Sequence, residues 1–410
     1  NKLLAEMTDE VAALVLANNY QQTLAVSLAR RRGLADLTHQ ERFMQALEGR
    51  GLLDRAVEAL PSSAAVADRQ LRGEPLTRAE LGVLLAYAKL TLFDDVVATA
   101  LPDDPHFEAD LFAYFPARMG KKYAGEIRAH RLRREIVATQ LANDAVNRGG
   151  PSFVARMQDL TGHTAAETVA AFAVVRDGFE LPALYGEIDA LDTKIDGDAQ
   201  LELYQSVGRL VHSATAWLLK NDDMAAPVGQ RCAALRAARK ALEGRLEPLL
   251  SSFVAGRLEE RVGEFLGLGV PEALARKVAF LWVAESIPDM MRIAAETGGD
   301  LIEAARAFLA VTQAFRIGRI NEAARALSPT DYYDGLSLSR ALETIGAARR
   351  GMAAAALAGH GGAADPVAAW LEAGGERVAR TRERLQALTE GGDLTVSRLT
   401  VASGLMTDLS

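Results

Sequence analysis

The feature that most limits the fold of this chain is the spacing of its apolar residues, which recur every three and four positions along most of the sequence. That spacing gathers side chains on one face of an α-helix, whereas a half-buried strand alternates at every second residue. Two such series are Tyr204, Val207, Val211, Ala214 and Leu218, and Leu301, Ala305, Phe308, Thr312 and Phe315. The one weak strand candidate is LTVSRLTVASGL at residues 394–405. The sequence therefore predicts an all-α fold with no substantial sheet.

Chain length and turn residues divide the expected helices into subdomains. At 410 residues the chain exceeds the usual size of one hydrophobic core, so we expect a multi-helix bundle architecture in two or more subdomains. The periodicity lapses and turn residues gather at residues 60–75, 221–230 and 359–366. We therefore predict three parts, at residues 1–60, 61–220 and 221–410.

Charge and cysteine content exclude several classes of protein. The formal net charge of -8 does not provide the basic field of a general nucleic-acid binder, so no nucleic acid is expected as a partner. No stretch approaches the roughly 18 apolar residues of a membrane span, so no membrane partner is expected either. Cys232 is the only cysteine in the sequence, which rules out an intrachain disulfide and a multi-cysteine metal site. These features fit the reducing cytoplasm.

Familiar motifs for cofactors and catalysis are incomplete. Residues 120–122 (GKK) lack the upstream glycine and the following serine or threonine of a phosphate-binding loop, and Gly267 and Gly269 lack the third glycine of a dinucleotide fingerprint. The six histidines never pair at a spacing of four, so no metal site is expected. The acidic pairs do not complete Asp-Asp-x-x-Asp, and Asp94 is interpreted with Thr91 as a helix start. We therefore predict no catalytic, cofactor-binding or metal-binding residue.

One stretch, HRLRREIVATQLANDAVNRGGPSF at residues 130–153, places polar side chains on an expected helix face. Its amides continue an apolar stripe, and a buried amide costs roughly 1–3 kcal/mol unless it is hydrogen-bonded. This pattern indicates a helix that docks within the bundle, or against a neighbouring domain or subunit. The candidate docking or interface residues are Arg133, Arg134, Gln140, Asn143, Asn147 and Arg148.

Several stretches in the same order carry a resemblance to a known family. They are NKLLAEMTDEVAALVLANNYQQTLAVSLA (1–29), LTRAELGVLLAYAKLTLFDD (76–95), YFP (114–116), the stretch at 130–153, and TGHTAAETVAAFAVVRDGFELPALYGEIDALD (161–192). With these residues the chain resembles the C-terminal helical region of the large bacterial NAD-specific glutamate dehydrogenases. The resemblance is ordered through about residue 220 and looser beyond it.

The resemblance implies a parent enzyme that oxidatively deaminates L-glutamate to 2-oxoglutarate and ammonia, with NAD as the hydride acceptor. It also implies that the catalytic residues and the nucleotide fingerprint lie upstream of Asn1, so NAD is expected for the parent and no cofactor for this segment. Residues 1–60 then correspond to helices that leave the upstream catalytic region, 61–220 to a helical domain, and 221–410 to a C-terminal helical bundle.

Two functions stay open at this point. The first is a noncatalytic C-terminal module for assembly or allosteric regulation, whose partners are the upstream catalytic domain and further copies in a homo-oligomer. Within this first function, the alternative to docking is an allosteric pocket in which Arg134 or Arg148 holds a small anion or an amino acid. The second function is a free-standing α-helical interaction scaffold.

Overall fold

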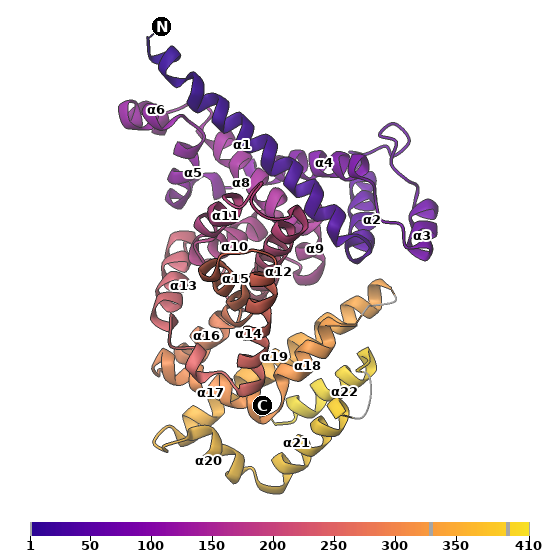
Figure 1. Cartoon of the computed structure of the whole chain (residues 1–410), viewed down its shortest axis with the longest axis vertical. Coiled ribbons are helices and arrows are strands. Elements are labelled where there is room, and N and C mark those ends of the chain that lie inside the picture. Colours follow the sequence, from indigo (N-terminus) through magenta and orange to yellow (C-terminus); the bar gives the residue numbers. More distant parts are fainter. Residues whose placement is uncertain (1, 328–330, 391–393, 410) are drawn as a thin grey trace. The chain divides into compact units, whose positions relative to one another are not determined.

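The fold is all-α, as the apolar spacing predicts. The computed structural model describes residues 2–327, 331–390 and 394–409, and within these residues the chain forms 22 α-helices, three short 3-10 helices and no strand (Figure 1). The weak strand candidate at residues 394–405 is wrong, because this segment folds as α22 (Val396–Thr407). Thr395 caps that helix, its hydroxyl accepting a hydrogen bond from the Arg398 amide at 3.2 Å. No helix of the described residues is both long and apolar enough to cross a membrane.

The chain divides into two compact units, Asn1–Ala234 and Leu235–Ser410, and the division falls inside α13 (Val228–Leu242). The other elements of the first unit are α1 (Lys2–Arg32), α2 (Leu34–Gly49), α3 (Ser63–Arg72), α4 (Arg78–Val97), η1 (Leu101–Asp103), η2 (Pro105–Phe107), α5 (Glu108–Ala113), α6 (Ala117–Lys122), α7 (Ala124–Arg128), α8 (Arg133–Gly149), α9 (Phe153–Thr161), α10 (Ala165–Gly178), α11 (Leu181–Asp189) and α12 (Gly197–Asn221). The elements of the second unit are η3 (Glu247–Leu249), α14 (Ser252–Gly267), α15 (Glu272–Ala284), α16 (Ile287–Thr297), α17 (Leu301–Ala314), α18 (Ile317–Arg325), α19 (Tyr332–His360), α20 (Pro366–Ala373), α21 (Gly375–Glu390) and α22.

Helix α10 forms the centre of the first unit. Eleven of its 14 residues are buried, and α4, α8, α9, α11 and α12 pack around it (Figure 1). A helix that is apolar on all sides is stable only inside a core, so this sequence selects the interior position. The start of α10 is set by a capping box, in which Thr164 and Glu167 satisfy free amides of the first turn; Thr77 and Glu80 do the same for α4.

Helix α19 organises the second unit. It packs against α16, α17, α20 and α22, and its buried stripe includes Ile345, Met352 and Ala356. An ion pair joins it to α16, where the carboxylate of Asp289 is 6% exposed and lies 2.6 Å from the guanidinium of Arg350. Arg349 approaches the other oxygen of Asp289 at 3.5 Å. Burial of these charges inside the unit is tolerated because they are paired.

Two local expectations need correction. Thr91 does not start a helix, because α4 continues without interruption from Arg78 to Val97 and the Thr91 hydroxyl donates to the Tyr87 carbonyl at 2.8 Å. The stretch at residues 60–75, expected as a linker, contains the ten-residue helix α3, which Ser62 caps. The turn residues expected at 221–230 and 359–366 do coincide with breaks, after α12 and after α19.

The end of α8 is packed too closely to accept a side chain. A Cβ atom at Gly149 would lie 2.3 Å from the Phe153 ring, which is only 1% exposed. The Gly149 carbonyl is also held, because Nη1 of Arg32 and Nε2 of His212 each reach it at 2.8 Å. Burial and the neighbouring Arg32 guanidinium lower the pKa of His212, which keeps the imidazole neutral beside that cation.

We predict that Gly149→Ala destabilises the chain by about 1–3 kcal/mol, because the added methyl group overpacks the contact with Phe153. The measurement is the free energy of unfolding in urea. Gly186→Ala is the matched control, since Gly186 is an exposed position of α11 where an added methyl group would meet no atom within 4 Å. The control should gain about 0.5–1 kcal/mol from better helix propensity. Equal effects at the two glycines would contradict the packing argument.

Candidate functional site

The structure separates the candidate docking residues into two groups at opposite ends of α8. At its start, Arg133 and Arg134 both pair with the carboxylate of Asp103 in η1. Arg134 also donates to the carbonyl oxygens of Val97 at 2.9 Å and Thr99 at 2.8 Å. These two guanidinium groups therefore fasten the loop after α4 to the start of α8 within this chain.

The amides of the stripe become more buried toward the end of α8. Gln140 and Asn143 are half-buried, and Asn147 is 6% exposed. The stripe predicts paired asparagine amides, yet Oδ1 of Asn147 has no hydrogen-bond partner among the described residues. A buried amide oxygen without a partner is costly, so the polar stripe does not by itself account for the stability of this region.

Arg148 lies inside the first unit. Its side chain is 7% exposed, and its guanidinium lies 3.8 Å from the ring centroid of Tyr185 and 6.0 Å from that of Tyr204. Asp144 approaches its Nε at 4.0 Å. Cation–π contacts of this kind stabilise a desolvated guanidinium by roughly 2 kcal/mol. Arg148 thus serves the packing between α8, α11 and α12.

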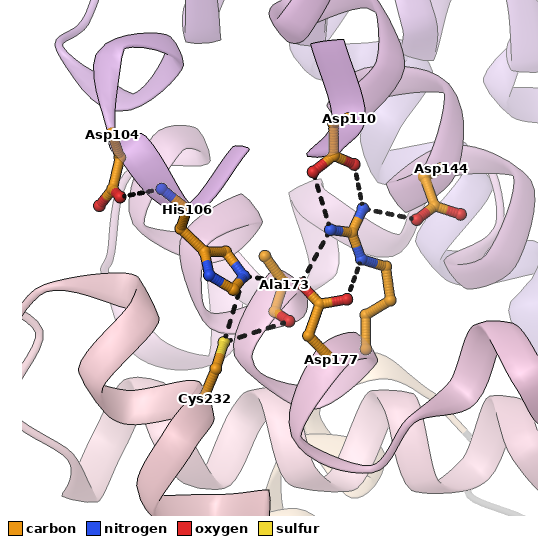
Figure 2. Close-up of polar contacts among 8 residues, drawn as sticks. Asp104, His106, Asp110, Asp144, Ala173, Asp177 and Cys232 are labelled. Carbon is orange, nitrogen blue, oxygen red and sulfur yellow. Dashed lines mark hydrogen bonds and ion pairs between the residues drawn. The ribbon is translucent and has the colours of Figure 1, made fainter. Parts of the chain in front are cut away.

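A different cluster, centred on Arg176 of α10, gathers charge in the interior of the first unit (Figure 2). The Arg176 side chain is 9% exposed and meets three carboxylates. Its Nη1 lies 2.7 Å from Asp110 of α5 and 3.1 Å from Asp144 of α8, and its Nε lies 2.8 Å from Asp177. One guanidinium therefore faces three carboxylates.

His106 and Cys232 extend the cluster on the other side of Asp177 (Figure 2). Nε2 of His106 lies 2.7 Å from Oδ2 of Asp177 and 3.4 Å from Sγ of Cys232. Asp104 positions the histidine, because its carboxylate caps η2 by accepting the His106 amide at 2.9 Å. Cys232 comes from α13 and is 2% exposed. Three elements, η2, α10 and α13, thus bring one nitrogen, one oxygen and one sulfur donor together.

The charges of this cluster shift its pKa values strongly. Hydrogen bonding to Asp177, and then to Cys232, raises the pKa of His106 to about 10. Burial opposes ionisation of Asp177, but hydrogen bonds from His106 and Arg176 outweigh it and lower the pKa of that carboxyl to about 2. Both shifts show that the cluster stabilises positive charge next to Asp177.

The arrangement does not fit a cysteine nucleophile activated by a histidine and an aspartate. In such a triad the acid holds one ring nitrogen while the other nitrogen faces the nucleophile. Here Asp177 and Cys232 both approach Nε2 of His106, and the thiol is buried. The donor atoms of His106, Asp177 and Cys232 instead lie within 4.8 Å of one another, a grouping that can hold a metal ion.

Sequence reasoning missed this cluster because its members are far apart in the chain and none belongs to a spacing motif. One signal was present in AAFAVVRDGF (residues 170–179), where Arg176 and Asp177 interrupt an apolar helix. A charged pair in a fully buried helix requires partners from other elements. That signal indicates a buried charge cluster but does not identify Asp110, Asp144, His106 or Cys232 as its members.

Comparison with known proteins places the chain in a family. The family model described as glutamate dehydrogenase, C-terminal, matches residues 73–408, and the chain belongs to this family. It is 40% identical over 314 residues to the NAD-specific glutamate dehydrogenase of Pseudomonas aeruginosa, covering 77% of this chain and 19% of that protein. It is 38% identical over 289 residues to the enzyme of the same name from Halomonas elongata, covering 68% of this chain and 17% of the relative.

A third relative extends the match to the N-terminal helices. The NAD-specific glutamate dehydrogenase of Mycobacterium tuberculosis is 32% identical over 406 residues, which cover 98% of this chain and 25% of that protein. The chain therefore spans a quarter or less of the length of these relatives. These findings confirm the family resemblance drawn from the sequence.

We predict that Arg176→Met destabilises the chain by about 3–5 kcal/mol, because three carboxylates lose their shared cation in a buried site. The measurement is urea unfolding at neutral pH. Arg128→Met is the matched control, since Arg128 pairs with Glu108 while both side chains are about half exposed, at 55% and 49%. Loss of the exposed pair should change the free energy of unfolding far less, because water screens the two charges. A loss of similar size in both variants would contradict the role given to burial.

Proposed function

We propose that this chain is a noncatalytic helical C-terminal module that supports assembly or allosteric regulation of an NAD-dependent glutamate dehydrogenase. The parent reaction is the conversion of L-glutamate to 2-oxoglutarate and ammonia, with NAD as its cofactor. The family match and the names of the relatives support this assignment. Its partners are the catalytic region of the same polypeptide and further copies in a homo-oligomer.

One structural observation carries the proposal of a docking role. Helix α1 is a single helix of 31 residues whose two halves differ in burial. Leu24, Ala25 and Ala29 are buried in its C-terminal half, where α1 packs on α4, α8 and α12. In its N-terminal half, Val11 is 46% exposed and Val15 is 53% exposed.

Three exposed apolar residues lie within six positions of α1. Val11 and Val15 are four positions apart and share a helix face, and the adjacent Leu16 is 67% exposed. Contiguous apolar surface on a helix favours burial against another protein surface. The relatives are at least four times longer than their matched region, so the proposed occupant is the remainder of the enzyme polypeptide.

The noncatalytic part of the proposal rests on the sequence. Neither a phosphate-binding loop nor a dinucleotide fingerprint is complete in the chain, and the arginines considered for an anion pocket are engaged elsewhere. Arg134 binds Asp103 and two backbone carbonyls, and Arg148 stacks on Tyr185. These contacts favour docking over ligand binding as the role of α8.

We expect the 410-residue chain to give a helical circular dichroism spectrum yet no glutamate oxidation and no saturable heat on titration with NAD. A complete glutamate dehydrogenase of the same family, titrated under the same conditions, is the positive control. Saturable NAD binding by the isolated chain would overturn the noncatalytic assignment. A normal result for the control together with no binding by the chain supports it.

The docking role has its own test in the complete enzyme. We expect Val11→Glu combined with Val15→Glu to lower the oligomer mass or to shift the glutamate saturation curve, because two charges would enter the apolar contact. Light scattering and steady-state kinetics measure these effects. Leu71→Glu is the matched control, because Leu71 is 87% exposed on α3 and lies outside the proposed surface. If the double variant and the control both behave as the unchanged enzyme, α1 does not dock, and the scaffold alternative gains support.

A further inference from the structure

The cluster of His106, Asp177 and Cys232 has no place in the proposed docking function, yet it holds the donor set of a metal centre. We propose that these three side chains bind one divalent transition-metal ion, with Zn²⁺ as the ion that best matches them. Their ligand atoms already lie within 4.8 Å of one another. They are supplied by η2, α10 and α13 of the first unit, all of which pack around one point (Figure 2).

One of the three donor distances already matches a tetrahedral zinc centre, and a second must lengthen. Bond lengths of about 2.0–2.3 Å in such a centre place neighbouring donor atoms about 3.3–3.8 Å apart. Sγ of Cys232 and Nε2 of His106 are separated by 3.4 Å, which needs no adjustment. Nε2 of His106 and Oδ2 of Asp177 are 2.7 Å apart, so they must separate by a few tenths of an ångström when an ion replaces the hydrogen-bonding proton.

The charge of the surroundings also accommodates a divalent ion. Asp110, Asp144 and Asp177 place three carboxylates around Arg176, and without an ion the positive charges of His106 and of Arg148, 4.0 Å from Asp144, lie beside them. A coordinated Cys232 thiolate would add a fourth negative charge. A buried set of charges is stable only when it is compensated, and a divalent ion that replaces the His106 proton would compensate the added thiolate charge.

The chemistry of the donors selects the metal. Thiolate and imidazole ligands favour zinc and other late transition metals, whereas Mg²⁺ and Ca²⁺ prefer sites built from oxygen atoms. Arg176 acts as an outer support, because its Nε donates to Oδ1 of Asp177 at 2.8 Å and its Nη2 donates to Oδ2 at 2.9 Å. Oδ2 also faces His106, at 2.7 Å. Three protein ligands leave one position of a tetrahedral zinc ion for water or another small ligand. The ion would fasten the beginning of α13 to α10 and η2.

Metal binding can be measured on the 410-residue chain after dialysis against a chelator. We expect one equivalent of Zn²⁺ to bind in a competition titration with a chromophoric chelator, and the melting temperature to rise with Zn²⁺ concentration. Cys232→Ala and His106→Gln each remove a ligand. Each should weaken Zn²⁺ binding by at least the roughly 10–100-fold that loss of an outer-shell partner costs.

His163→Gln is the matched control for these substitutions. His163 pairs with Glu167 at 3.3 Å, is partly exposed, and lies outside the cluster. This variant should keep the affinity and the melting-temperature response of the unchanged chain. Zn²⁺ binding that survives in Cys232→Ala, or that is lost equally in the control, would overturn the assignment.

A spectrum of the unchanged chain makes the test independent of whether any variant folds. Co²⁺ in place of Zn²⁺ should give the visible bands of a tetrahedral ion together with a thiolate-to-cobalt charge-transfer band in the near ultraviolet. Co²⁺ binding without the charge-transfer band would exclude Cys232 as a ligand. Failure to bind either ion would show that the cluster is held by its hydrogen bonds and ion pairs alone. Neither outcome depends on the docking role of α1, so the metal-site proposal and the docking proposal are tested independently.

Discussion

The first unit depends on one buried cation, the guanidinium of Arg176. Helix α10 is almost entirely apolar and lies at the centre of the unit, so a charge near its end needs partners from the surrounding helices. Asp110 and Asp144 provide them from α5 and α8, at 2.7 and 3.1 Å. Apolar burial can be satisfied by many arrangements of these helices. A guanidinium makes directed hydrogen bonds, so only helix arrangements that bring the carboxylates to Arg176 can satisfy it. The charge cluster therefore helps to specify how these helices pack.

Arg176 also affects how His106 and Cys232 are placed on the other side of Asp177. Because Arg176 holds both oxygens of that carboxylate, the orientation of Asp177 is fixed, with Oδ2 also facing His106, whose imidazole lies against Cys232. A line of directed contacts thus runs from α5 and α8 through α10 to η2 and α13. Helix α13 contains the division between the two compact units, so these contacts fix its beginning within the first of them. The three carboxylates around Arg176 and the ligands of the proposed metal ion belong to this one arrangement.

The sequence predicted the features that depend on local spacing, such as the helices. It did not predict contacts between residues that are distant in the chain. Apolar periodicity identified the helices, and the capping boxes formed by Thr77–Glu80 and Thr164–Glu167 are equally local, because both partners lie within one turn. The spacing of residues does not show whether a basic residue at a helix start binds another subunit or a carboxylate of its own chain. In the structure, Arg133 and Arg134 bind Asp103 of the same chain. Histidine pairs at a spacing of four are a local signal, whereas His106 contacts Asp177 and Cys232, which are 71 and 126 positions away in the sequence. Contacts between residues so far apart in the sequence depend on how whole helices pack.

A segment without catalytic residues influences a distant reaction only if its contacts differ between states of the enzyme, or if it holds subunits in an arrangement that favours one state. Helix α1 is suited to this role by its continuity. Its 31 residues extend over about 46 Å, so its two ends can belong to different environments while remaining one rigid element. The end that carries Leu24 and Ala29 is fixed in the core, whereas the end that carries Val11 and Val15 presents apolar surface. In the proposed docking role, a displacement at the exposed end would be carried by this continuous helix to the helices that pack on the buried end, and the reverse would hold equally.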